Sequence, residues 1–192
     1  MKMDKQDILK IFNDPNFIDV YLEWEAATRS YETHYQRLIE GIPLHSRDRV
    51  LDVGASQGSP SQALFRKQPN LEVVAVEPCE NVFQIAKAVF TGQGLENLIK
   101  KYANNISILN YLGDQYQECS KYSSHISFEN GFAEDVHDLS LGKFDHVLAS
   151  CALHWLIDPE KSFHNFYEVL NPNGTVAISS ASWKYKPSHP NL

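Results

Sequence analysis

Between residues 4 and 26 the apolar side chains return every three or four positions, which is the period of an amphipathic helix. The pair Asp14-Pro15 interrupts this pattern and predicts two helices in place of one. Thr28 belongs to a residue type that caps helices, and we expect it to start a third helix that reaches Glu40. We therefore interpret residues 1–44 as a helical cap on the remainder of the chain.

From residue 45 onward, short apolar runs alternate with helix-like stretches. Five runs are predicted to be strands: Val50–Val53, Leu71–Val76, Ile126–Phe128, Phe144–Ser150 and Thr175–Ser179. Three stretches between them are predicted to be helices: Ser61–Lys67, Asn81–Phe90 and Pro159–Leu170. Continuous apolar runs indicate strands that are buried on both faces, as in a parallel sheet covered by helices. The order predicts an α/β fold, a Rossmann-like, doubly wound parallel sheet in three layers over residues 45–192.

One segment departs from the alternation of strand and helix. Roughly 50 residues separate the second and third predicted strands, which is more than a single crossover helix needs. The part over residues 91–124 is rich in Asn, Tyr, Lys and Gly and is expected to carry extra helix. Two interpretations stay open for this insertion: a lid or wall of an acceptor pocket, or a surface insertion without a role in binding.

Composition and charge argue against several function classes. The 192 residues carry a formal net charge of −7, which argues against a nucleic-acid-binding surface. The three cysteines form no C-x-x-C pair, so neither a disulfide framework nor a zinc site is indicated, and no metal is expected. The charged N-terminus lacks the apolar core of a signal peptide, and no apolar run reaches the ~18 residues of a membrane span. We expect a cytoplasmic protein without a membrane partner.

The segment RVLDVGASQGSP, residues 49–60, has the form of a strand that passes into a helix through a ligand-binding loop. Gly54 and Gly58 let the backbone approach a ligand and take positive φ angles. Glu77 ends the second strand, 23 positions after Gly54, where a carboxylate suits two ribose hydroxyls. The order of strand, glycine loop, helix, strand and acid therefore predicts a nucleoside-type ligand.

Two features argue against a nicotinamide dinucleotide in this loop. The fingerprint G-x-G-x-x-G fails at Ser56 and at Ser59, counted from Gly54. Asp52 stands just before the loop, where a carboxylate would repel a pyrophosphate but attract a cation. An NAD-dependent oxidoreductase is therefore the weakest of the functions considered.

Four sequence motifs occur in order: VLDVGASQGS, VVAVEP, FDHVLASCALHWL and FYEVLNPNGTVAIS. Together they resemble the motifs of class I S-adenosylmethionine-dependent methyltransferases, whose first motif is usually written L-D-x-G-x-G-x-G. The third motif is similar to that of small-molecule members, including the trans-aconitate and juvenile-hormone-acid methyltransferases. The resemblance spans residues 45–180. It implies S-adenosyl-L-methionine as the cofactor and methyl transfer to a small molecule, with a carboxylic acid as one candidate.

The resemblance also implies roles for individual residues. Asp52 is expected near the methionine end of the cofactor, Glu77 on the ribose hydroxyls and Pro78 beside the adenine. Ser150 is expected to offer its backbone carbonyl to the cofactor's amino group. The expected cofactor-binding residues are Asp52, Gly54, Ala55, Ser56, Gly58, Glu77, Pro78, Phe132, Ala133, Glu134, Ser150 and Cys151.

The sequence departs from the family pattern at the adenine end. Many relatives carry an Asp that accepts from the adenine amino group at the position occupied here by Phe132. Three alternatives stay open: Phe132 stacks on or walls the adenine, Glu134 or Asp135 supplies the acceptor, or adenine recognition is degraded. Ser56 replaces the middle glycine of the first motif, where a small residue still fits with some loss of backbone freedom.

Methyl transfer from a sulfonium is an in-line displacement, so the protein mainly positions both partners and excludes water. A general base is needed only if the acceptor arrives protonated, and His154 is the candidate for that role. Trp155, Tyr31 and Tyr35 are expected to line the substrate pocket together with His154; packing in the core or against the next helix is the alternative for each. A cofactor-binding module that does not turn over is the second functional interpretation.

The resemblance implies a seven-stranded sheet, whereas the pattern here ends after the fifth strand. The strand Thr175–Ser179 would then form an exposed sheet edge. Three explanations stay open: the chain is a fragment, a partner such as a second copy in a homodimer covers the edge, or the N-terminal helices and the insertion compensate.

Overall fold

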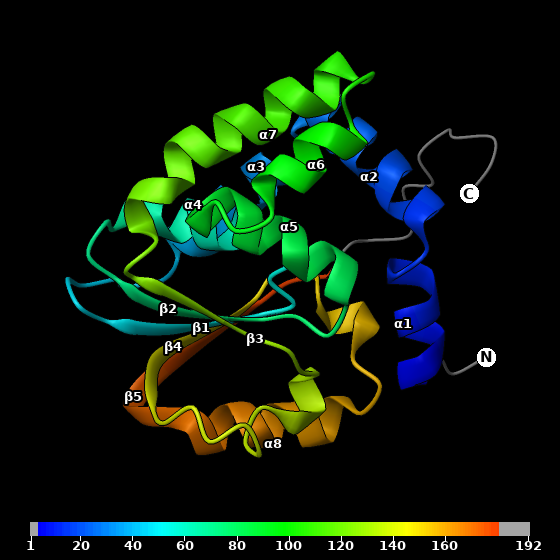
Figure 1. Ribbon diagram of the computed structural model, residues 1–192. Helices are drawn as coiled ribbons and strands as arrows, with labels where there is room; N and C mark the ends of the chain where they lie inside the picture. The colour runs from blue at the N-terminus through cyan, green and yellow to red at the C-terminus, as the bar shows by residue number, and fades with distance from the viewer. Residues whose placement is uncertain (1–3, 181–192) are drawn as a thin grey trace.

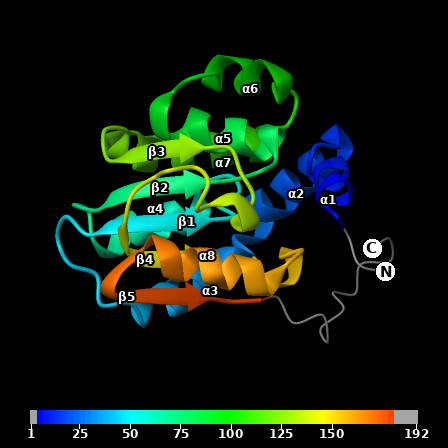
Figure 2. The same ribbon diagram turned by 90° about the horizontal axis from the view of Figure 1, so that it is seen from below.

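The computed structural model describes residues 4–180, except for the side chains of residues 30–33. Its centre is a five-stranded parallel sheet of order β3-β2-β1-β4-β5. The strands are β1 (Arg49–Val53), β2 (Glu72–Val76), β3 (Ile126–Glu129), β4 (Phe144–Ala149) and β5 (Leu170–Ile178). The chain steps outward from β1 to β3 and then returns to β4 on the other side of β1, which makes the β1–β4 junction the switch point of the sheet (Figure 2). The predicted doubly wound α/β fold is confirmed.

Helices cover both faces of the sheet, and they do so unequally (Figure 1). One face carries α3 (Ser30–Glu40), α4 (Ser59–Lys67), α5 (Glu80–Thr91) and α7 (Ile106–Cys119), while α8 (Pro159–Val169) covers the other. Because side chains alternate along a strand, neighbouring residues of β1 enter different cores. Val50 joins the larger core under α4 and α5, whereas Leu51 joins the smaller core with Phe166 of α8.

The N-terminal helices are α1 (Lys5–Phe12) and α2 (Pro15–Thr28). The predicted break between them is confirmed, because Pro15 opens α2 and the Asp14 carboxylate accepts from the Asn16 N–H. The prediction for Thr28 is wrong: this residue ends α2, and its hydroxyl donates to the Trp24 carbonyl one turn earlier. The joint with α3 is Arg29, which takes a left-handed backbone conformation with φ 44°.

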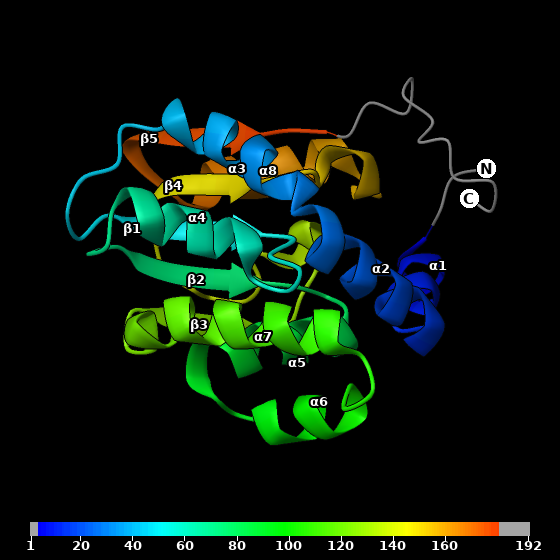
Figure 3. The same cartoon turned by 90° about the horizontal axis from the view of Figure 1, so that it is seen from above.

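The insertion over residues 91–124 forms two helices, α6 (Leu95–Lys101) and α7, and a short 3-10 turn, η1 (Ser120–Tyr122). Both helices contact the N-terminal α2 (Figure 3). Asp19 accepts from Lys101 Nζ and from the Tyr102 hydroxyl, each at 2.7 Å, and Glu23 accepts from Asn105 Nδ2 at 2.7 Å. The predicted extra helix is therefore present, and it is hydrogen-bonded to the N-terminal helix α2.

The boundaries near the last strand differ from the prediction. Helix α8 ends at Val169, and β5 begins at Leu170, five residues before the predicted strand. The pairing of β4 with β5 contains a register shift, and Asn173 takes φ 67° near this irregularity. Within residues 4–180, β5 pairs only with β4 and therefore forms an edge of the sheet. No helix of the described part is long and apolar enough to cross a bilayer.

Candidate active site

The carboxyl ends of the strands meet at one side of the sheet, and α1 and α2 stand beyond them (Figure 2). The first of these ends is the glycine loop after β1. Gly54, Ser56 and Gly58 all take positive φ angles, of 72°, 53° and 95°. At Gly58 the close approach of α5 adds a second requirement, because a Cβ there would lie 2.8 Å from Phe90 Cε2. The loop thus has the tight geometry that the sequence predicts, with Ser56 in a conformation that favours glycine.

The acid after β2 is hydrogen-bonded to this loop. Glu77 is only 7% exposed, and its Oε2 accepts from the Ser56 N–H at 2.9 Å. Its other oxygen, Oε1, accepts from the Cys79 N–H at 3.0 Å. Burial raises the pKa of Glu77, and these two backbone hydrogen bonds oppose the rise. The glycine loop and the acid, both predicted to bind the ligand, are therefore joined by a hydrogen bond.

Asp52, near the end of β1, is fully buried. Its Oδ2 accepts from the Ser61 hydroxyl at 2.6 Å, and within the described residues its Oδ1 has no hydrogen-bond partner. Burial, together with the negative charge of Glu77, raises the pKa of Asp52 to about 7. Buried polar atoms in native proteins are almost always paired, so this oxygen is available to accept from water or from a ligand at the end of β1.

The segment after β3 forms the rim beside Glu77. The Glu134 carboxylate accepts from the Ile157 and Asp158 N–H groups, at 2.8 and 3.1 Å, and thereby holds the start of α8. Asp135 is ion-paired with Lys5 of α1 at 2.5 Å, and Lys5 also lies over the Phe132 ring at 4.9 Å. Of the alternatives for the adenine end, Glu134 is thus committed elsewhere, whereas Phe132 and Asp135 both face α1.

The segment after β4 forms the opposite rim and meets the end of β5. Ser150 is buried, and its hydroxyl has no partner among residues 4–180. Cys151 takes φ 52° and donates its N–H to Ser179 Oγ at 2.9 Å. Ser179 Oγ is also 2.8 Å from His34 Nε2, while His154 Nδ1 is 3.2 Å from the next hydroxyl, Ser180 Oγ. Two histidines therefore converge on consecutive serines.

The surroundings of His154 and His34 both favour the neutral imidazole. Burial lowers the pKa of His154, and burial together with the nearby positive charge of Arg37 lowers the pKa of His34. A neutral imidazole can accept a proton, which is the requirement for a general base. The sequence interpretation named His154 as the candidate base and gave no role to His34. Trp155 packs edge-on against Phe12 of α1 at 4.9 Å and so ties this rim to the cap.

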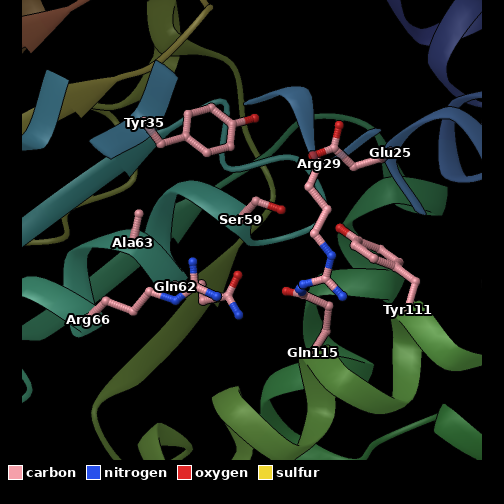
Figure 4. A pocket seen from close by; sticks show the side chains of 9 residues that line it. All are labelled: Glu25, Arg29, Tyr35, Ser59, Gln62, Ala63, Arg66, Tyr111 and Gln115. Carbon is pink, nitrogen blue, oxygen red and sulfur yellow. The ribbon is translucent and has the colours of Figure 1, made fainter. Parts of the chain in front are cut away.

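The two tyrosines expected in the substrate pocket have different outcomes. Tyr35 is 4% exposed and packs in the main core. It lines a polar cavity of about 20 Å³ between α2, α3, α4 and α7, together with Glu25, Arg29 and Tyr111 (Figure 4). The structure therefore places Tyr35 in the main core, on the wall of this cavity. The side chain of Tyr31 lies outside the described residues.

The structure adds two polar residues that the motifs did not indicate. Tyr21 of α2 donates to Gln57 Oε1 at 2.9 Å, and the Ser56 hydroxyl donates to the same oxygen at 2.6 Å. This pair of hydrogen bonds links the cap to the glycine loop. Among the described side chains, those of residues 4–29 and 34–180, no group of His, Cys, Asp and Glu has the geometry of a metal site.

Comparison with known proteins agrees with this architecture. The sequence matches the family model of a methyltransferase domain over residues 51–178. A putative S-adenosyl-L-methionine-dependent methyltransferase of Methanococcus maripaludis superposes with a TM-score of 0.60 at 18% identity, covering 94% of this chain and 68% of that one. A putative methyltransferase of Bacillus halodurans gives a TM-score of 0.55 at 20% identity, covering 78% of this chain and 52% of that one. The [4+2]-cyclase SpnF gives 0.55 at 17% identity, covering 79% and 45%.

These structural likenesses establish the fold. The chain spans about half the length of the first two solved structures that it matches, 50% and 52%. No curated protein matches the sequence. The family match, by contrast, extends from β1 to the end of β5 and covers well over half of the sequence. By this match, the chain belongs to the methyltransferase domain family.

Proposed function

We propose that this chain binds S-adenosyl-L-methionine at the carboxyl ends of β1, β2 and β4 and transfers its methyl group to a small-molecule acceptor. The observation that carries the proposal is the orphaned, buried Oδ1 of Asp52, set beside a glycine loop that is joined to a second buried acid, Glu77. A ligand that combines a cationic amino-acid end with a ribose fits this pair of carboxylates. A pyrophosphate does not fit, because its negative charge would face Asp52 without water to screen it.

The residues divide into three groups along such a ligand. Asp52 would hold the cationic methionine end. Glu77 would accept the ribose hydroxyls, since each carboxylate oxygen retains a lone pair beside its backbone hydrogen bond. Phe132 and Ala133, on the rim after β3, would wall the adenine, and Ser150 and Cys151 would offer backbone groups from the opposite rim.

When bound, the cofactor supplies a methyl group that its sulfonium has already activated. The chain then has to hold donor and acceptor in line and to keep water away, which contributes most of the rate in such a displacement. Helix α1 contacts both rims, through Lys5 on one side and Phe12 on the other, and α2 contacts the glycine loop through Tyr21. This arrangement suits a site from which water is excluded.

The acceptor side is proposed to lie near His154. Its half-buried, neutral imidazole can take a proton from a hydroxyl or an amine acceptor, whereas a carboxylate acceptor would need no base. His34 is a second candidate for the same task, because it reaches the adjacent serine. A non-catalytic cofactor-binding module remains the second functional hypothesis, and Phe132 at the position of an adenine acceptor is the observation in its favour.

Calorimetric titration of the purified chain with S-adenosylmethionine, S-adenosylhomocysteine and NAD tests the cofactor. We expect saturable binding of both adenosyl compounds and none of NAD; a folded chain that binds neither adenosyl compound would refute the proposal. Transfer of labelled methyl groups to a panel of small carboxylic acids, phenols and amines then separates the two hypotheses. Binding with no transfer to any member would favour the non-catalytic module.

A further inference from the structure

Ser61 stands next to Asp52 at the start of α4. Both side chains are fully buried, and the Ser61 hydroxyl donates to Asp52 Oδ2 at 2.6 Å. The backbone N–H of Ser61 also stabilises the charged carboxylate. A short hydrogen bond of this kind fixes the rotamer of the acid and commits one of its two oxygens. Ser61 therefore determines which oxygen of Asp52 remains available.

The surroundings of Asp52 hold no other polar partner for that second oxygen. Its register partners on the flanking strands are Ala75 of β2 and Leu148 of β4, both apolar and buried. Glu77 is the titratable group whose charge acts on Asp52, and it is itself a buried acid. Within residues 4–180, neither carboxylate forms an ion pair with a lysine, an arginine or a histidine. Two acids thus share a buried site without a positive charge.

We propose that Ser61 is a positioning residue: it holds one carboxylate oxygen of Asp52 and leaves the other oxygen to bind the cationic end of the cofactor. Binding of the cofactor then releases a proton from Asp52. The proposal rests on the proposed function for the identity of the ligand. Below neutral pH the ligand-free site carries a proton on Asp52. The cationic end of the cofactor takes the place of this proton, and the proton leaves to solvent. No covalent bond forms or breaks in this step.

The physical reason is the low polarity around the acid. Desolvation disfavours the charged carboxylate, and Glu77 disfavours it further, whereas the hydrogen bond from Ser61 favours it. Without the Ser61 hydroxyl, Asp52 would hold its proton more tightly. A cation would then have to displace a more firmly bound proton, and this loss would be largest at low pH. A serine that merely fills space would give no such dependence on pH.

The first test uses the ligand-free protein and is independent of the cofactor. The Asp52 carboxyl is titrated by NMR in the parent chain, in Ser61→Ala and in Ser162→Ala. Ser162 is a matched control, since it is also fully buried and its hydroxyl donates to a backbone carbonyl in α8. We expect Ser61→Ala alone to raise the pH at which Asp52 titrates. An unchanged titration in a folded Ser61→Ala variant would overturn the proposal whatever the protein binds.

The second test measures binding of S-adenosylmethionine by calorimetry at pH 6 and pH 8, in buffers of different ionisation enthalpy. A hydrogen bond to a charged group changes an equilibrium about tenfold or more. Relative to the parent, we therefore expect Ser61→Ala to bind about tenfold more weakly at pH 6 and only about twofold more weakly at pH 8. The parent should release a proton at pH 6, and Asp52→Asn should release none at this site. Equal losses at both pH values would refute the proton linkage.

The failure of the proposed function would look different. In that case no variant, the parent included, would bind S-adenosylmethionine, while the NMR titration would still report on Ser61 and Asp52.

Discussion

Ser56 is the residue at which the glycine loop differs most from a run of glycines. A left-handed conformation costs a non-glycine residue about 1–2 kcal/mol. Here the strain is offset, because the Ser56 N–H donates to Glu77 and its hydroxyl donates to Gln57. A glycine at this position would keep the backbone bond to Glu77, so the serine exchanges backbone freedom for one added hydrogen bond, the one from its hydroxyl to Gln57.

Glu77 provides the sharpest test at the residue scale. Glu77→Ala removes the proposed ribose acceptor and leaves the Ser56 N–H and the buried Cys79 N–H without their partner. We expect S-adenosylmethionine to bind about 1–3 kcal/mol more weakly, as measured by calorimetry. Glu72→Ala is the control, because Glu72 begins β2, the strand that Glu77 follows, and is exposed. Parent-like binding by Glu77→Ala would show that the cofactor does not reach the end of β2.

Sequence reasoning singled out Gly58 and Glu77 from their spacing and Asp52 from its place before the loop. The structure bears out the local geometry, because Gly58 takes a positive φ angle and Glu77 is hydrogen-bonded to the loop, while the binding roles of these residues stay predictions. Sequence reasoning missed Ser61 and His34, since serine and histidine on a helix carry no signal of what lies opposite. Their partners, Asp52 and Ser179, are distant in the sequence or on another element, so only the packed structure brings them together.

At the scale of elements, the insertion between β2 and β3 packs against the rest of the fold through α7. Helix α7 buries Ile108 and Leu112 in the main core and contacts α2 and α5. The sequence indicated extra helix here but gave no contact for it, because the apolar positions of α7 do not identify the surface that they cover. The insertion is part of the core that supports the cap, which disfavours its interpretation as an independent surface loop.

Substitutions in α7 test whether this helix is part of the main core. Leu112→Ala, at a fully buried position, should lower the free energy of unfolding by about 2–5 kcal/mol in urea denaturation. Ile106→Ala is the matched control: Ile106 lies on the same helix, is 68% exposed, and should change stability by less than about 0.5 kcal/mol. Similar small effects for both variants would mean that α7 folds apart from the core.

At the scale of elements the sequence was also least accurate at boundaries. It placed the start of the third helix at Thr28 because a threonine is a good cap, yet the helix continues through this residue and turns at Arg29. It placed β5 five residues too late, because the Pro172–Gly174 turn signals hid the pairing that begins at Leu170. At Thr28 the hydroxyl bonds back to the Trp24 carbonyl within α2 and does not cap the next helix, whereas at Leu170 the pairing with β4, which a local pattern does not contain, sets the start of the strand.

For the whole molecule, the two buried acids make stability depend on pH. Folding raises the pKa of Asp52 from 3.8 to about 7, so between these values the folded chain holds a proton that the unfolded chain has released. The free energy of unfolding therefore falls through this group as the pH increases from about 4 to about 7. Glu77, whose pKa is also raised, contributes with the same sign.

The pKa values of Glu118 and Asp145 are lowered by hydrogen bonds to neighbouring groups, so these carboxyls act with the opposite sign but at lower pH, near and below their ordinary pKa values. Comparing the parent with Asp52→Asn isolates the contribution of Asp52 to the pH dependence of stability. In thermal unfolding of the ligand-free protein, we expect Asp52→Asn to gain stability over the parent as the pH increases from 5 to 8. A constant difference across this range would contradict the raised pKa of Asp52.

Helix α1 touches both rims of the strand ends, with Lys5 on the Phe132–Asp135 side and Phe12 on Trp155. Eight residues near the start of the sequence therefore join the segment after β3 to the segment after β4, so a substitution in α1 reaches both sides of the strand ends at once. The arrangement of these two segments thus depends on a helix that is far from both of them in the sequence.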